Sequence, residues 1–126
     1  MSLFPLSLDQ ERARRLRSYL QEYRTYLLTQ RAPSTERNTI QRLLQALQGK
    51  LMHESERVPP GGSFSLLLSG QEAAALKTMA VDLRALRTQE PSSEHRNASI
   101  ADLTALKGMV ERLPSSERTY SMQSLL

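Results

Sequence analysis

The chain has 126 residues, of which 39% are hydrophobic and 24% charged, with 17 basic and 13 acidic side chains and a net charge of +4. This length predicts a single domain with its own core and is too short for two of ordinary size. The absence of cysteine excludes a disulfide scaffold and a thiolate zinc site.

The positive charge is concentrated in the first half of the chain. Residues 1–31 hold six basic and three acidic side chains, residues 32–60 hold four and three, and the remainder holds seven of each. No run approaches the ~20 apolar residues that span a bilayer, and the N-terminus lacks the charge pattern of a secretory signal. These features predict a cytoplasmic protein and disfavour a membrane partner.

The stretch from residue 8 to residue 31 carries the longest helical pattern. Its apolar residues recur at spacings of three and four and therefore fall on one stripe of a helix; they are Ala13, Leu16, Leu20, Tyr23 and Leu27. Ser7, with Gln10 three residues later, predicts the N-cap of this helix. Pro33 predicts its end.

Two polar flanks border this stripe. Arg17, Arg24 and Arg31 fall on one flank at heptad spacing, and Tyr19 and Tyr26 fall on the other. Side chains of this kind often cover the edge of a core and keep only their polar ends in water. The alternative is that arginines about 10 Å apart along the helix contact phosphates or carboxylates, with the tyrosines beside them as stacking or anchoring groups.

A second helix is predicted after Pro33, with Ser34 as its N-cap. Its apolar face comprises Ile40, Leu43, Leu44, Leu47 and Leu51. Gly49 indicates either that the helix ends there or that it continues less firmly toward Glu54. The short connection between the two helices favours an antiparallel helical hairpin over residues 7–56.

The clearest break in the chain contains two prolines and two glycines and predicts a loop over residues 57–63. The apolar residues Phe64 to Leu68 that follow fit either a short strand or irregular chain that leads into the next helix. A lone strand leaves its backbone groups unpaired. Because no second strand candidate is found, irregular chain is the favoured interpretation, and a strand would have to pair with another chain.

Two further helices form a predicted second hairpin over residues 69–114. Ser69 and Glu72 make a capping box at the start of the first, whose inward face comprises Leu76, Met79, Ala80, Leu83 and Leu86. Ser99, with Asp102 three residues later, predicts the N-cap of the second, whose inward face comprises Ile100, Leu103, Leu106, Val110 and Leu113. Residues 115–126 are predicted to form a mobile tail.

Together these elements predict an all-α fold, a single-domain bundle of about four helices arranged as two antiparallel hairpins. No internal repeat is evident at a convincing period.

The sequence carries little that points to catalysis. Only His53 and His95 can act as acid-base groups at neutral pH, both lie in predicted connections, and neither has metal-binding spacing. Gly61-Gly62 lacks the lysine and further glycines of a phosphate-binding loop. We therefore expect a protein that is not an enzyme, with no cofactor and no metal.

The favoured hypothesis is a small protein-interaction module that associates with itself or serves as a subunit or adaptor of a larger assembly. The alternative is an accessory protein that binds nucleic acid through its backbone without sequence preference. An anionic membrane surface is a third, minor alternative. Candidate contacts to the partner or to phosphate are Arg14, Arg15, Arg17, Tyr19, Arg24, Tyr26, Arg31, Arg37 and Arg42.

Overall fold

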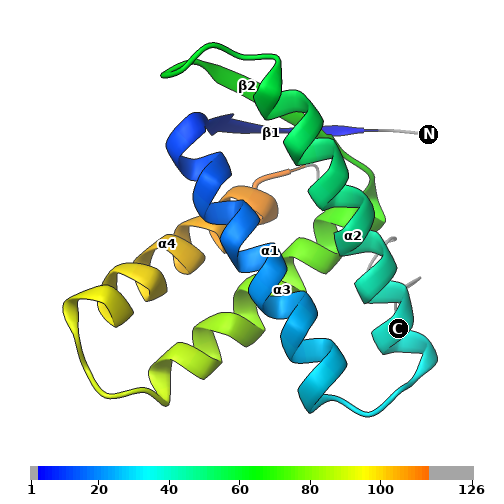
Figure 1. Cartoon of the computed structure of the whole chain (residues 1–126), viewed down its shortest axis with the longest axis vertical. Helices are drawn as coiled ribbons and strands as arrows, with labels where there is room; N and C mark the ends of the chain where they lie inside the picture. The colour runs from blue at the N-terminus through cyan, green and yellow to red at the C-terminus, as the bar shows by residue number, and fades with distance from the viewer. Residues whose placement is uncertain (1–2, 114–126) are drawn as a thin grey trace.

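The structure is a computed structural model and describes residues 3–113. Its elements follow in the order β1 (Phe4–Asp9), α1 (Gln10–Gln30), α2 (Thr35–Glu56), β2 (Ser63–Leu68), α3 (Gly70–Thr88) and α4 (Glu94–Glu111) (Figure 1). The fold is mostly helical, as predicted, but it also contains a two-stranded sheet, so the all-α description is only roughly right. The predicted tail at residues 115–126 lies outside the described residues.

β1 and β2 pair antiparallel, which corrects the prediction of irregular chain at residues 64–68. The sequence offered no second strand candidate, yet residues 4–9 form one. Pro5 cannot donate a hydrogen bond to a sheet, but proline is tolerated on an edge strand. Side chains alternate between the core and solvent along both strands. Those that enter the core are Phe4, Leu6, Leu8, Leu66 and Leu68.

Two of the predicted helix starts are confirmed. The Ser34 hydroxyl accepts a hydrogen bond from the backbone N–H of Arg37 at 3.0 Å, and Ser69 and Glu72 form the expected capping box. α2 then passes Gly49 and ends at Glu56, because the helix tolerates an exposed glycine at moderate cost.

The other two predicted starts are wrong. Ser7 lies within β1, and the carboxylate of Asp9 instead caps α1 by accepting from the N–H of Arg12 at 2.7 Å. α4 starts at Glu94 with Ser93 as its cap, and Ser99 is buried within the helix. Both errors arose where two capping residues lie a few positions apart, since either one satisfies the local pattern.

The six elements form two successive β-α-α repeats. Strands and first helices correspond at one constant offset in the sequence, and equivalent residues share their burial or their capping role, except that Phe4 is buried and Phe64 is half-buried. The corresponding pairs are Phe4 and Phe64, Leu6 and Leu66, Leu8 and Leu68, Asp9 and Ser69, Ala13 and Ala73, and Leu16 and Leu76.

The second helices, α2 and α4, correspond at an offset one residue smaller. Their starts are similar, Pro-Ser-Thr-Glu-Arg-Asn at residues 33–38 and, with one residue more, Pro-Ser-Ser-Glu-His-Arg-Asn at residues 91–97. The N-cap serines Ser34 and Ser93 correspond at this offset, as do Arg37 and Arg96. The arginine in each binds a carbonyl at the end of the preceding helix, Arg37 that of Arg31 at 3.3 Å and Arg96 that of Arg87 at 3.0 Å. The same side chain therefore closes both helical hairpins.

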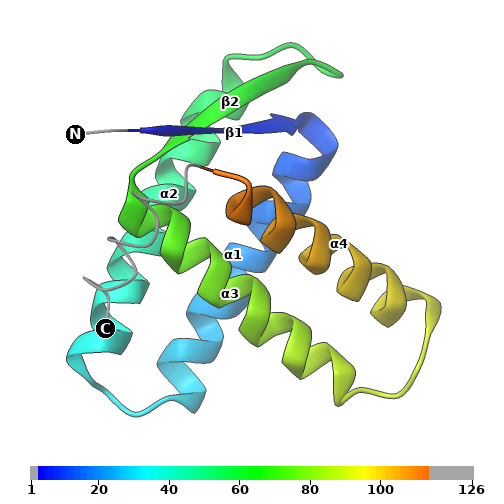
Figure 2. The same cartoon turned by 180° about the vertical axis from the view of Figure 1, so that it is seen from behind.

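The strand register relates the two repeats by an approximate twofold axis. Phe4 pairs with Leu68 and Leu8 with Phe64, while the corresponding residues Leu6 and Leu66 lie directly opposite each other. In Figure 2, which is turned by 180° from Figure 1, α3 takes the front position that α1 has in Figure 1. The internal repeat that was not evident from the sequence is thus the organising feature of the fold.

One hydrophobic core extends through all six elements. The stripe predicted for α1 is fully buried, and the faces predicted for the other helices are buried or half-buried. None of the helices within residues 3–113 has the length and apolar character needed to cross a membrane.

Candidate binding groove between α1 and α4

The two repeats meet differently on the two sides of the twofold axis. α2 packs against α3, whereas the backbones of the corresponding helices, α4 and α1, approach each other less closely. A groove of about 640 Å³ opens between α1 and α4. This volume is in the range of ligand-binding clefts. Its charged and aromatic lining residues are Arg12, Arg15, Tyr19, Glu22, Arg87, His95 and Asp102.

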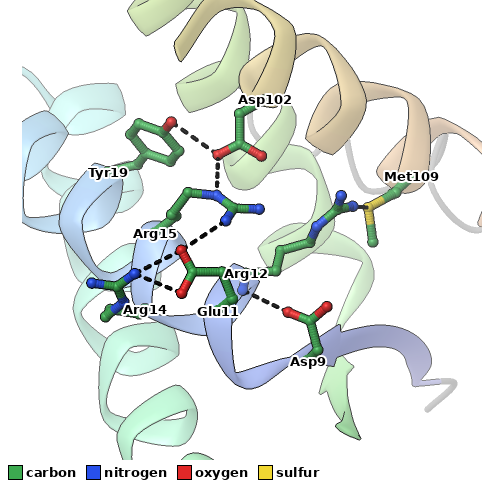
Figure 3. A network of polar contacts seen from close by, with 8 residues as sticks. All are labelled: Asp9, Glu11, Arg12, Arg14, Arg15, Tyr19, Asp102 and Met109. Carbon is green, nitrogen blue, oxygen red and sulfur yellow. Dashed lines mark hydrogen bonds and ion pairs between the residues drawn. The ribbon is translucent and has the colours of Figure 1, made fainter. Parts of the chain in front are cut away.

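Asp102 is the centre of the polar contacts in this groove (Figure 3). Its Oδ2 atom accepts hydrogen bonds from Arg15 Nε and from the Tyr19 hydroxyl, each at 2.9 Å. Burial and the hydrogen bond to Asp102 raise the pKa of Tyr19, and the hydrogen bond to Asp102 raises the pKa of Arg15. The tyrosine therefore stays a neutral donor and the arginine a fixed cation.

Arg12 is a cation at the wall of the groove that has no carboxylate partner within the described chain. Its guanidinium Nη1 lies 2.7 Å from the sulfur of Met109, which is a weak and neutral acceptor (Figure 3). On the opposite side of the twofold axis the corresponding residues, Glu72 and Lys50, form an ion pair at 2.8 Å. Of these two equivalent positions, only the one on the α1–α4 side therefore carries a positive charge without an ion-pair partner among the described residues.

Arg87 of α3 lines the groove and forms an ion pair with Glu22 of α1. It donates two hydrogen bonds to the carboxylate of Glu22, at 2.6 and 2.5 Å, and this contact raises its pKa. A bidentate arginine-carboxylate pair is geometrically specific and holds both side chains in place. His95, in the first turn of α4, is exposed at the same groove.

The tyrosine flank predicted for α1 does not form an exposed surface. Tyr19 is buried and engaged with Asp102. Tyr26 is half-buried and stacks on Tyr23, with ring centroids 5.9 Å apart and an interplanar angle of 16°. Both rings pack against the core, Tyr26 with part of its surface exposed, and of the candidate residues only Arg15 and Tyr19 line the groove.

The remaining candidate arginines lie toward α2 or on its surface. Arg14 forms an ion pair with Glu11 at 2.6 Å. Arg24 donates to the side-chain oxygens of Gln41 at 3.3 Å and Gln48 at 2.6 Å. These two amides fix the Arg24 guanidinium without neutralising its charge.

Arg17, Arg31 and Arg42 are exposed, and none of them has an ion-pair partner among residues 3–113. Arg37 is hydrogen-bonded to the side chain of Asn38 and to a backbone carbonyl. We call Arg17, Arg24 and Arg31 the arginine row. Among residues 3–113, no carboxylate lies within ion-pair distance of this row.

Several groove residues were not identified from the sequence: Arg12, Glu22, Arg87, His95 and Asp102. Both histidines were placed in connections, but His53 lies in α2 and His95 in α4. The matching Pro-Ser segments and the matching Phe-x-Leu-x-Leu strands are the signal that could have revealed the repeat, and with it the pairing of α1 with α4.

The described residues contain no cluster of three or more side chains suited to hold a metal ion. No protein-family model, curated protein or solved structure matches the chain. Its function is therefore inferred from the geometry of its side chains.

Proposed function

We propose that the protein is a non-enzymatic interaction module whose groove between α1 and α4 binds an acidic segment of a protein partner. The observation that supports this most strongly is the position of Arg12, an uncompensated cation on the wall of an open groove. A partner carboxylate at this point can replace a thioether as the acceptor and form a charge-assisted hydrogen bond.

The surrounding contacts support binding by a preorganised surface. Arg15 and Tyr19 are held by Asp102, and Arg87 by Glu22, so these side chains lose little freedom when a partner docks. Ala98, Ala101 and Ala105 on the α4 wall leave room for the partner's apolar side chains. Charged anchors beside apolar space are typical of protein-interaction sites.

The experiment is fluorescence anisotropy with a labelled peptide of glutamate and leucine, compared with a lysine and leucine peptide of the same length. Arg12→Glu places a like charge at the binding point and should weaken binding of the acidic peptide by about tenfold or more. Ala105→Trp fills the groove from an exposed position and should abolish binding.

Arg84→Glu is the matched control, because it makes the same charge change at an exposed site outside the groove. It should retain most of the affinity. The proposal is wrong if the acidic peptide does not bind, or if Arg84→Glu weakens binding as much as Arg12→Glu does.

The arginine row supports nucleic-acid binding as a second candidate function. Arg17 and Arg24 lie in α1, and Arg31 is its C-cap. Arg17 also lines a hollow of about 580 Å³ with Arg14, Gln21, Glu22 and Gln48, where two arginines outnumber one carboxylate. Arginine and glutamine side chains both contact the phosphate backbone in protein–DNA complexes. This arrangement predicts weak, sequence-independent binding that falls steeply as salt increases.

The test is anisotropy of labelled single-stranded and duplex oligonucleotides at low and near-physiological salt. Changing Arg17 and Arg31, the two exposed members of the row, to Glu should abolish binding, whereas Arg12→Glu should weaken it only slightly because that side chain faces the groove. No binding at low salt excludes this function and leaves the acidic-partner proposal unaffected.

A further inference from the structure

Several kinds of contact join the first repeat to the second. The strand pairing runs between β1 and β2, Tyr23 of α1 donates to Asp82 of α3 at 2.5 Å, and Lys50 of α2 pairs with Glu72 of α3. The only covalent link between the repeats is the connection at residues 57–62. The repeats therefore resemble two subunits of a dimer that share one chain.

This connection is a tight turn that depends on its glycines. The N–H of Gly62 donates to the carbonyl of Pro59 at 2.9 Å, and Gly61 has a φ of 81°. A Cβ atom at Gly62 would lie 2.5 Å from Cγ1 of Val58 and 3.0 Å from the Pro59 oxygen. A side chain at either glycine thus strains the closed turn and has no equivalent cost when the turn is open.

We infer that two copies of this chain associate by exchanging repeats, with the turn at residues 59–62 opened in both. The first repeat of each copy then pairs with the second repeat of the other, and every contact named above is retained between chains. Among residues 3–113, opening the turn costs the hydrogen bond from Gly62 to Pro59 that closes it. Exchange of identical elements of this kind is a known low-cost route to dimers and is characteristic of repeat proteins.

Exchange has a direct consequence for the groove. In the exchanged dimer, Arg12, Arg15 and Tyr19 come from one chain and Asp102 from the other, and the dimer carries two such grooves. A partner with two acidic segments can engage both and gain avidity without any new contact. The oligomeric state then sets the valence of the binding surface.

The closed monomer is expected to dominate in dilute solution. Linked repeats face each other at an effective concentration in the millimolar range, which a second chain must match. Strain confined to the closed turn shifts this balance toward the dimer, because the turn is closed only in the monomer.

The test is light scattering coupled to size-exclusion chromatography, over a range of protein concentrations, for wild type, Gly61→Val and Gly62→Ala. Turn strain of the size expected for such backbone positions should lower the concentration at half-dimerisation by about tenfold or more. Gly49→Ala is the matched control, since a Cβ atom there meets nothing within 4 Å, and it should behave as wild type. Monomeric Gly61→Val and Gly62→Ala proteins with wild-type helical content overturn the inference.

A complementation experiment gives a result even if the turn variants fail to fold. Leu44→Asp disrupts the first repeat and Leu103→Asp the second, because both leucines are fully buried at corresponding positions. When the two full-length variants are unfolded, mixed and refolded together, they should form a heterodimer of twice the 14.3 kDa monomer mass and regain helical signal. A mixture whose signal equals the sum of the separate variants contradicts the inference.

Discussion

The two sides of the twofold axis show how one backbone plan supports a closed contact and an open one. At equivalent positions, the α2–α3 side carries Leu43, Ala75 and Met79, and the α1–α4 side carries Asp102, Arg15 and Tyr19. The apolar set allows two helices to pack, and the polar set holds the helices through hydrogen bonds and leaves a groove. Where the two repeats differ is therefore where a binding site is expected.

The outer surfaces of the two repeats differ in charge because equivalent positions carry different residues. In the second repeat, Glu111 forms ion pairs with Lys77 at 3.3 Å and Lys107 at 3.0 Å, and these contacts lower its pKa. The corresponding residues of the first repeat are Met52, Arg17 and Gln48. The positive surface of the first repeat thus reflects a missing carboxylate as well as its arginines.

The largest loss of stability is expected from substitutions in the paired strands, where the two repeats are most alike. Leu6 and Leu66 are 2% and 1% exposed and face each other at the twofold axis. Leu6→Ala and Leu66→Ala should each lower the free energy of unfolding by about 2–5 kcal/mol, because each leaves a cavity in the same layer of the core. Denaturant titration measures both losses.

Leu67→Ala is the control, because that side chain is 48% exposed, and it should change stability by less than about 0.5 kcal/mol. A loss at Leu66 without a comparable loss at Leu6 breaks the equivalence of the two strands.

A smaller effect is expected at the centre of the groove. Asp102→Ala removes the shared acceptor of Arg15 Nε and the Tyr19 hydroxyl. Arg15 keeps its ion pair with Glu11 at 3.1 Å, whereas the hydroxyl of the buried Tyr19 loses its acceptor. The free energy of unfolding should fall by about 1–3 kcal/mol, and denaturant titration measures this.

The combined change of Asp102→Leu, Arg15→Ala and Tyr19→Met copies the closed side onto the open one. It should restore stability relative to Asp102→Ala and abolish binding of the acidic peptide. If this variant stays as unstable as Asp102→Ala, the polar contact is not what distinguishes the two sides.

The loss of stability at alkaline pH should come from the first repeat. Burial and the hydrogen bond to Asp82 raise the pKa of Tyr23, whereas the corresponding residue of the second repeat is Leu83. A raised pKa means that the folded chain keeps its proton longer. The contribution of Tyr23 is fully present below the unfolded phenol pKa of about 10 and is lost as pH rises above it.

Denaturant titration between about pH 8 and about pH 11 covers the range around the unfolded phenol pKa of about 10. Above that pKa, the free energy of unfolding of the wild type should fall by up to about 1.4 kcal/mol per pH unit because of Tyr23. Tyr23→Phe should reduce this slope. Tyr19 contributes in the same direction, so a remaining slope is expected, but an unchanged one contradicts the assignment.

The smallest change in stability is expected from substitutions of the exposed arginines. Arg17, Arg31 and Arg42 are exposed and form no ion pair within the described residues, so changing each to Glu should alter the free energy of unfolding by less than about 0.5 kcal/mol. Thermal unfolding measures this. A larger loss would show that these side chains hold the first repeat together and do not form a free surface.

The helices were predictable from the sequence because their apolar stripes are local, as are the two N-caps that were placed correctly. Leu16 and Leu20 identify the buried face of α1, and Ser34 and Ser69 identify two helix starts, from residues within one or two turns. The strands were not predicted, because each is stable only through the other and they lie far apart in the chain. Phe64 to Leu68 alone could not indicate that Phe4 to Asp9 was its partner.

The candidate site was predicted less well, for the same physical reason. Arginines such as Arg15 could be placed on a face of α1, but their partners come from tertiary contacts. Asp102 looked like the second half of a capping box and is instead the acceptor at the centre of the groove. The repeat itself was hidden because its offset changes by one residue between the first and second helices.

The pairing of β1 with β2 about a twofold axis relates the two repeats and underlies the whole fold. Ser7 and Ser65 lie opposite each other on the exposed face of the ribbon, and the chain contains no cysteine of its own. Opposite residues of an antiparallel pair are within disulfide reach. Oxidising the variant with Ser7→Cys and Ser65→Cys and digesting it for mass spectrometry should yield the cross-linked peptide pair, whereas two free thiols under oxidising conditions would contradict the register and the twofold relation.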